Sequence, residues 1–216
     1  MVAPLFQDRV YVDDFPASGF DHVVGNARDI AATLTLADYH AEGAPTATDL
    51  QRIAMPLTDS LSAELDGAAA HLRVPAGKLL LAALGRAVAR AIGCGVVAVD
   101  VDSRIIALDC VPPAELDATE MLGHVCSALA ASTVRQPGQA PADLAFRCVG
   151  SDSTEGPLPG HALQLRAARS NGLVDLQWWF DARRFEAYTV EELAEQFPQA
   201  LIEITSEAIP GFTGAA

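Results

Sequence analysis

The spacing of apolar residues predicts two successive helices in the first half of the chain. Residues 59–72 carry leucine or alanine at every third or fourth position, which places these side chains on one face of an amphipathic helix. Pro75 suits the first turn of a second helix, because its missing N–H would have no partner there. We expect this second helix to end at Gly93 and Gly95, since glycine is typical of a helix C-terminus.

Runs of β-branched residues predict strands. Residues 96–101 are apolar on both faces at their start, which is typical of a central strand covered on both sides. A turn at residues 102–104 leads directly into a second strand over 105–111, and residues 144–149 predict a third.

The pair Asn171-Gly172 is the clearest local signal. Residues 162–170 and 173–180 flank it with strand-forming composition. Asn-Gly best adopts the positive φ angles of a two-residue type I′ turn, so the sequence predicts an antiparallel hairpin here.

Capping residues predict two more helix starts. Asp117 and Glu120 match a capping box, and Thr189 and Glu192 match a second one that opens the last predicted helix. Pro198 lies within this last helix, where we expect a kink.

The predicted elements define a fold class. Their order from residue 58 is α, α, β, β, α, β, β, β, α. This order indicates an α/β layered domain with a mixed β-sheet flanked by helices, antiparallel at the Asn171-Gly172 hairpin. We assign residues 44–216 to this domain.

The N-terminal part has a weaker pattern. We treat residues 1–43 as a separate segment, with a short strand over 9–12 and helical spacing over 27–40. A glycine and a proline within residues 43–46 interrupt the chain and mark the boundary.

Charge and composition exclude several classes of protein. Lys and Arg number 14 against 28 Asp and Glu, for a formal net charge of -14, which argues against nucleic acid and anionic membranes as partners. No apolar run approaches the roughly 20 residues of a membrane helix. The first ten residues lack the apolar core of a secretory signal, and the four cysteines form no C-x-x-C pair. We therefore expect a cytoplasmic protein, with reduced thiols favoured over two disulfides.

No group of residues predicts catalysis, a cofactor or a metal. Asp100 and Asp102 point the same way if both lie in a strand, so they could do acid/base chemistry, but turn capping and pairing with Arg104 is favoured. His124 and Cys126 would lie about 200° apart on a helix, which disfavours a nucleophile pair. No Cys/His set has zinc spacing, and no serine lies in a G-x-S-x-G motif.

The hairpin region carries the candidate interface residues. Trp178 and Trp179 are neighbours in a strand and face opposite sides, so we expect one in the core and one as a possible interface anchor. Positive charge is concentrated around the hairpin and its exit, at Arg166, Arg169, Arg183 and Arg184. The alternative is a solvated face whose arginines pair with nearby carboxylates, at Asp175, Asp181 and Glu186.

Four segments together resemble the C-terminal lobe of the condensation-domain family, acyltransferases of nonribosomal peptide assembly with a chloramphenicol-acetyltransferase-like fold. The segments are LSAELDGAAAHLRVPAGKLLLAALGRAVARAIG, VVAVDVDSR, LDATEMLGHVCSAL and VDLQWWFDARRFEAYTVEELAEQF. They match the family's helix pair, a strand ending before an arginine, the next helix, and the closing strand with the last helix. The resemblance spans about residues 58 to 208 and implies that Asp102, Ser103 and Arg104 have a structural role near the junction of two lobes.

Two departures from the family pattern change the functional expectation. The family's H-H-x-x-x-D-G motif, carried by its N-terminal lobe, does not occur around any of the five histidines. The segment between Arg104 and Leu116 is also short, whereas the family has a longer connection there that crosses to the other lobe.

These departures favour a non-catalytic lone-lobe partner or scaffold protein, related to condensation-type acyltransferases of nonribosomal peptide or lipid assembly. A lone lobe would leave one face bare, so a homodimer or a complementary lobe protein is expected to cover it, with a possible carrier-protein or synthetase link. One alternative is half of a split acyltransferase whose catalytic His motif lies on another chain. The other is a self-sufficient acyltransferase that uses different residues.

Overall fold

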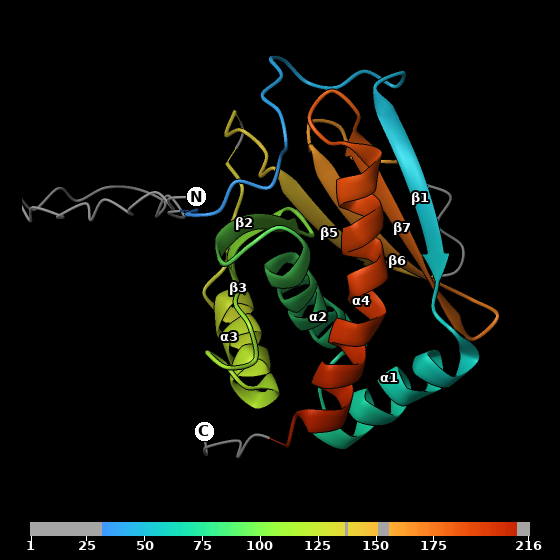
Figure 1. Ribbon diagram of the computed structural model, residues 1–216. Helices are drawn as coiled ribbons and strands as arrows, with labels where there is room; N and C mark the ends of the chain where they lie inside the picture. The colour runs from blue at the N-terminus through green and yellow to red at the C-terminus, as the bar shows by residue number, and fades with distance from the viewer. Residues whose placement is uncertain (1–31, 137, 151–155, 211–216) are drawn as a thin grey trace, which may run out of the picture.

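The strands form one mixed sheet, with helices packed on one face (Figure 1). The computed structural model describes residues 32–136, 138–150 and 156–210. Over these residues the seven strands have the order β1-β7-β6-β5-β2-β3-β4. The elements, in chain order, are β1 (Leu50–Pro56), α1 (Asp59–Leu72), α2 (Ala76–Ala91), β2 (Gly95–Val101), β3 (Arg104–Cys110), α3 (Ala118–Ala130), β4 (Thr133–Val134), β5 (Leu144–Val149), β6 (Leu163–Ser170), β7 (Leu173–Asp181) and α4 (Ala187–Glu207).

The pairing of the strands confirms the predicted α/β layered fold with a mixed sheet. β5 pairs in parallel with both β2 and β6, whereas the other neighbouring strands are antiparallel. The β6–β7 hairpin turns at Asn171 and Gly172, whose φ angles of 52° and 86° fit a type I′ turn. β2 lies inside the sheet as predicted, but the described helices cover only one of its faces (Figure 1).

Side-chain caps fix the starts of two helices. The Thr58 side chain accepts a hydrogen bond from the Leu61 N–H at the start of α1. At α3, Asp117 and Glu120 form the predicted reciprocal capping box, with bonds of 2.8 and 2.9 Å.

The start of α4 differs from the prediction. The helix begins at Ala187, so Thr189 lies in its first turn and is not the cap. The backbone N–H of Glu186, the N-cap residue, donates to Asp38 at 2.9 Å, and this tertiary contact fixes an earlier start than the local sequence indicates. Pro198 lies inside α4 as expected.

The N-terminal segment also differs from its prediction. Residues 32–40 are not helical, because they bind the lobe: the Thr33 and Leu34 N–H groups both donate to the Val96 carbonyl, at 2.9 and 3.1 Å. The proposed strand over residues 9–12 lies outside the described residues. β1, which no sequence signal predicted, is an edge strand of the sheet and pairs with β7.

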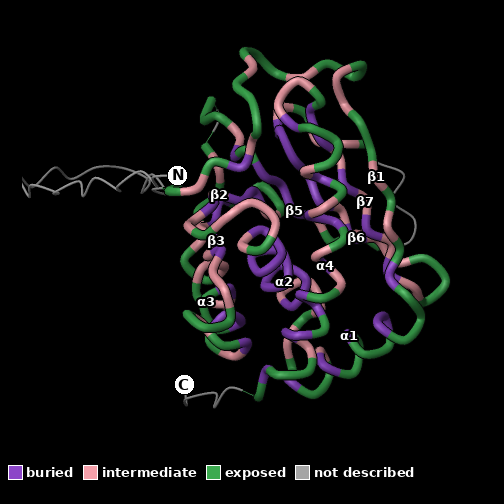
Figure 2. Tube along the Cα trace, in the orientation of Figure 1, coloured by how far each residue is buried: buried purple, intermediate pink, exposed green. Residues whose placement is uncertain are grey.

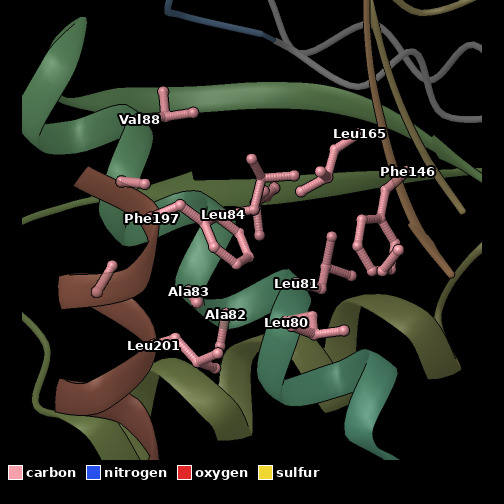
Figure 3. Packing of buried hydrophobic residues seen from close by; sticks show 14 of the residues in the cluster. Leu80, Leu81, Ala82, Ala83, Leu84, Val88, Phe146, Leu165, Phe197 and Leu201 are labelled. Carbon is pink, nitrogen blue, oxygen red and sulfur yellow. The ribbon is translucent and has the colours of Figure 1, made fainter. Parts of the chain in front are cut away.

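The core lies between the sheet and the helices, and α2 runs through its middle (Figure 2). Every residue of α2 from Leu79 to Val88 is buried, so this helix is covered all round. Figure 3 shows its side chains between Phe146 and Leu165 of the sheet and Phe197 of α4. Packing from both sides explains why α2 carries an unusually broad apolar stripe.

None of the helices in the described part of the chain is long and apolar enough to cross a membrane. The four cysteines are all free thiols, which agrees with the favoured prediction.

Candidate functional site

The strongest candidate site is the sheet face turned away from the helices. Along β7 the helix-facing residues are buried, and the alternate residues are only partly covered. None of the described helices packs on these alternate residues (Figure 1). We call this surface the open face; its larger polar and aromatic side chains are Arg52, Arg147, Gln164, Arg166, Gln177 and Trp179.

The two tryptophans divide between the two faces, as their spacing predicts. Trp178 is fully buried and packs edge-on against Phe197, with ring centroids 5.7 Å apart, so it belongs to the core. Trp179 lies half-buried on the open face. The Arg52 guanidinium of β1 lies 5.5 Å from its ring centroid, a cation–π contact that holds the ring in place.

Arg147 and Arg166 are paired positions on the parallel strands β5 and β6. Their side chains therefore leave the sheet at neighbouring points on the open face. The segment before β6 folds over part of this face, because Gln164 accepts from the Leu158 N–H at 2.7 Å and donates to its carbonyl at 2.6 Å.

Arg183 and Arg184, also predicted as interface residues, make internal ion pairs after β7. Arg183 binds both carboxylate oxygens of Asp181, at 2.8 and 3.0 Å, and lies 3.6 Å from Asp49. Hydrogen bonds from Arg183 hold the pKa of Asp181 below its ordinary value. Arg184 binds Asp143 at 2.8 Å. These contacts match the alternative in which the arginines pair with carboxylates, although the partners are only partly those expected.

Asp102 and Ser103 form the two-residue turn between β2 and β3. Both have positive φ angles, 48° and 66°, which fits a type I′ turn. Arg104 begins β3 and donates to the Ser132 hydroxyl at 3.1 Å. β3 therefore occupies most of the segment between Arg104 and Leu116, for which the resemblance implies a longer connection to another lobe.

The histidine and cysteine candidates have contacts or burial that fit a structural role. His124 lies 2.8 Å from Asp109, the kind of partner expected for a histidine at the edge of an apolar stripe. Burial raises the pKa of Cys110 to about 12, so this thiol is not a thiolate at neutral pH. Among the described residues, no three His, Cys, Asp or Glu side chains could hold a metal ion together.

Known proteins match this chain at the level of sequence and of fold. No family model matches the sequence. The chain is 33% identical over 239 residues to one component of the phenolphthiocerol/phthiocerol polyketide synthase of Mycobacterium tuberculosis (strain CDC 1551 / Oshkosh). That alignment covers 82% of this chain and 16% of the relative, so the chain spans a small part of the curated protein that it matches.

The structural matches are condensation-type domains. The epimerization domain from the third module of tyrocidine synthetase B superposes with a TM-score of 0.64 at 15% identity, covering 82% of this chain and 53% of that chain. The X-domain in its complex with OxyB from teicoplanin biosynthesis gives 0.60 at 15% identity, over 82% and 50% of the two chains. A structure of condensation domain-mediated chain release from the enacyloxin polyketide synthase gives 0.53 at 16% identity, over 77% and 42%.

The protein therefore has the condensation-domain fold, and its described residues form one lobe of that fold. This confirms the resemblance that the sequence segments indicate. The coverage of about half of the epimerization domain agrees with a match to one lobe of two.

Proposed function

We propose that this lobe is a non-catalytic partner or scaffold protein that binds a complementary lobe of the same superfamily. The observation that carries the proposal is the open face, which presents Trp179 beside three arginines in a chain without an H-H-x-x-x-D-G motif. A half-buried aromatic ring held in place by a cation is a good interface anchor, because little side-chain entropy is lost when it is covered.

The charges on the open face favour a different polypeptide over a second copy. In a two-fold symmetric dimer the same patch meets itself, so arginines would face arginines. The formal charge of -14 adds long-range repulsion between two copies. A different polypeptide that is not acidic overall, but whose docking surface carries local carboxylates, meets neither obstacle.

Two relatives support a role in protein assembly. The X-domain, which shares the fold, is described in complex with another protein, OxyB. The polyketide synthase component that matches in sequence is several times longer than this chain, so the matching region there is one part of a larger assembly. We place the present lobe in a comparable setting, linked to a synthetase or its carrier protein in the cytoplasm, where its free thiols would stay reduced.

The test is binding to a defined partner: a protein that carries H-H-x-x-x-D-G and is encoded beside this chain. The two proteins are purified separately, mixed, and measured by gel filtration with light scattering. We expect a one-to-one complex that Trp179→Ala weakens about tenfold or more, as for an aromatic anchor. Tyr188→Ala is the matched control, because Tyr188 is an exposed aromatic residue on α4, away from the open face.

Three results would contradict the proposal. They are a monomer that does not bind the partner, a homodimer through the open face, and a complex weakened only by Tyr188→Ala. The first would remove the partner role, and the second would replace the complementary lobe with a second copy.

The second candidate function is half of a split acyltransferase. It is favoured by the sequence match to a polyketide synthase and the fold match to a condensation domain that mediates chain release. In this case the mixture, but neither protein alone, transfers an acyl group from a thioester. Activity of this chain alone would instead support the third alternative, a self-sufficient acyltransferase.

A further inference from the structure

A cleft of about 360 Å³ lies at the end of β2. Its walls come from the 102–103 turn, β5, and the segments before β5 and β6, which the parallel pairing of β2, β5 and β6 brings together. The polar groups that line it are Asp100, Asp102, Ser103, Arg135, Arg147 and His161. The volume is large enough for a small organic molecule.

Asp100 is a buried carboxylate, and the described neighbouring groups contact only one of its two oxygens. Its side chain is 4% exposed, and Oδ2 accepts the Ala142 N–H at 3.1 Å and lies 3.5 Å from Nη1 of Arg135. Oδ1 is buried and has no hydrogen-bond partner among the described residues. A buried carboxylate oxygen without a donor is unfavourable, so a ligand that donates an N–H or O–H to this atom from the cleft would remove that penalty.

His161 is a second buried polar group that lines the same cleft. Its ring is 2% exposed, and Nδ1 lies 2.8 Å from the Ala142 carbonyl. A carbonyl can only accept, so Nδ1 carries the hydrogen.

The formal charges of the cleft balance. Asp100 and Asp102 supply two negative charges, and Arg135 and Arg147 supply two positive charges. A balanced cleft does not favour a polyanion or a bare cation. It suits a ligand that gives a hydrogen to Asp100 and also presents an anionic oxygen to a guanidinium.

We propose that this cleft binds a small carboxylic acid bearing a hydroxyl or amino group, with the donor on Oδ1 of Asp100 and the carboxylate on Arg135. The binding test uses this chain alone, because the cleft shares Arg147 with the open face on which the partner is proposed to dock.

Binding is tested with matched ligands on the full chain, followed by the imidazole and backbone amide signals in NMR spectra. Lactate and alanine each carry a donor and a carboxylate, propionate lacks the donor, and lactamide and alaninamide lack the carboxylate. We expect a saturable shift of the His161 ring with lactate or alanine, and about tenfold or more weaker binding of the other three. The stronger ligand of the first two shows whether the donor is a hydroxyl or an ammonium group.

Two variants connect the binding to its residues. Asp100→Asn keeps the size of the side chain and an oxygen for the Ala142 N–H, but it removes the charged acceptor; we expect about tenfold weaker binding. Asp109→Asn is the matched control, because it removes the same charge from the neighbouring strand outside the cleft. If Asp100→Asn does not fold, Arg135→Gln replaces it, and lactate should then bind no better than lactamide.

The inference is overturned if neither lactate nor alanine gives a saturable shift. It is also overturned if propionate binds as tightly as they do, or if Asp100→Asn and Asp109→Asn bind equally well. Partner binding is measured separately on the same purified chain. If the partner still binds while the ligand tests fail, only the cleft inference is overturned and the proposed function stands.

Discussion

Arg86 of α2 and Glu203 of α4 form an ion pair inside the core, with Nε of Arg86 2.9 Å from Oε1 of Glu203. Arg86 is fully buried, and its two terminal nitrogens donate to the carbonyls of Val111 and Leu116 at 2.6 Å each. One side chain therefore joins two helices to the segment that leads from β3 into α3. Burial lowers the pKa of Arg86 from its ordinary value, while Glu203 favours its charged form.

Removing one partner of this pair is expected to destabilise the fold strongly. Arg86→Leu leaves the largely buried Glu203 with Arg90 as its remaining ion-pair partner among the described residues, and leaves the Val111 and Leu116 carbonyls without their donors. We expect a loss of about 3 to 5 kcal/mol in the free energy of unfolding, measured with urea. The double variant with Glu203→Leu should recover part of that loss. Additive effects of the two changes would contradict direct coupling.

Local signals were sufficient for much of the fold. The apolar period predicted α1 over its observed bounds, and the Asn171-Gly172 turn and the Asp117 cap occur as predicted. β1 was missed because its partner strand lies about 120 residues away and its own polar and apolar alternation is weak. The helix expected over 27–40 is overridden across its described part by backbone hydrogen bonds to Val96, which no local pattern encodes.

The candidate sites depend more on tertiary structure. Alternation along β7 placed Trp178 and Trp179 on opposite faces, but the packing of α4 decides which of them is buried. The cleft was missed altogether. Asp100 and His161 are about 60 residues apart in sequence, and only the parallel pairing of β5 with its two neighbours brings them within 3.6 Å.

Gly85 marks a close approach between α2 and β3. A Cβ atom at this position would lie 2.5 Å from the Asp109 carbonyl oxygen and 2.4 Å from the end of Met121. Alanine favours a helix over glycine by about 1 kcal/mol, but the backbone clash outweighs this gain, so we expect Gly85→Ala to lose about 1 to 3 kcal/mol in urea unfolding. Gly67→Ala in α1 is the control, with open space around it and an expected gain of up to about 1 kcal/mol. Equal effects at the two sites would contradict the close packing.

The pair of Asp181 and Arg183 should make the fold sensitive to acid. The pKa of Asp181 is lower in the folded protein than its ordinary value, chiefly through hydrogen bonds from Arg183. Its stabilising contribution is therefore full above the unfolded pKa, about 3.9, and is lost as the pH falls through the folded pKa. Asp181→Asn removes this titration, so its unfolding free energy should fall less than that of the wild type between about pH 5 and pH 2. Parallel pH profiles for the two proteins would show that Asp181 contributes no such dependence.

The four free thiols should react with an alkylating reagent in an order set by burial. Cys94 is exposed, whereas Cys110 is fully buried and its pKa is raised to about 12 by that burial. The thiolate is the reactive form, so at pH 8 iodoacetamide should modify Cys94 within minutes and leave Cys110 intact in the folded protein. Peptide mass spectrometry measures both sites, and the same reaction in urea is the control in which Cys110 becomes reactive. Rapid modification of Cys110 without denaturant would mean that α2, packed on β3, opens far more readily than a core of this density allows.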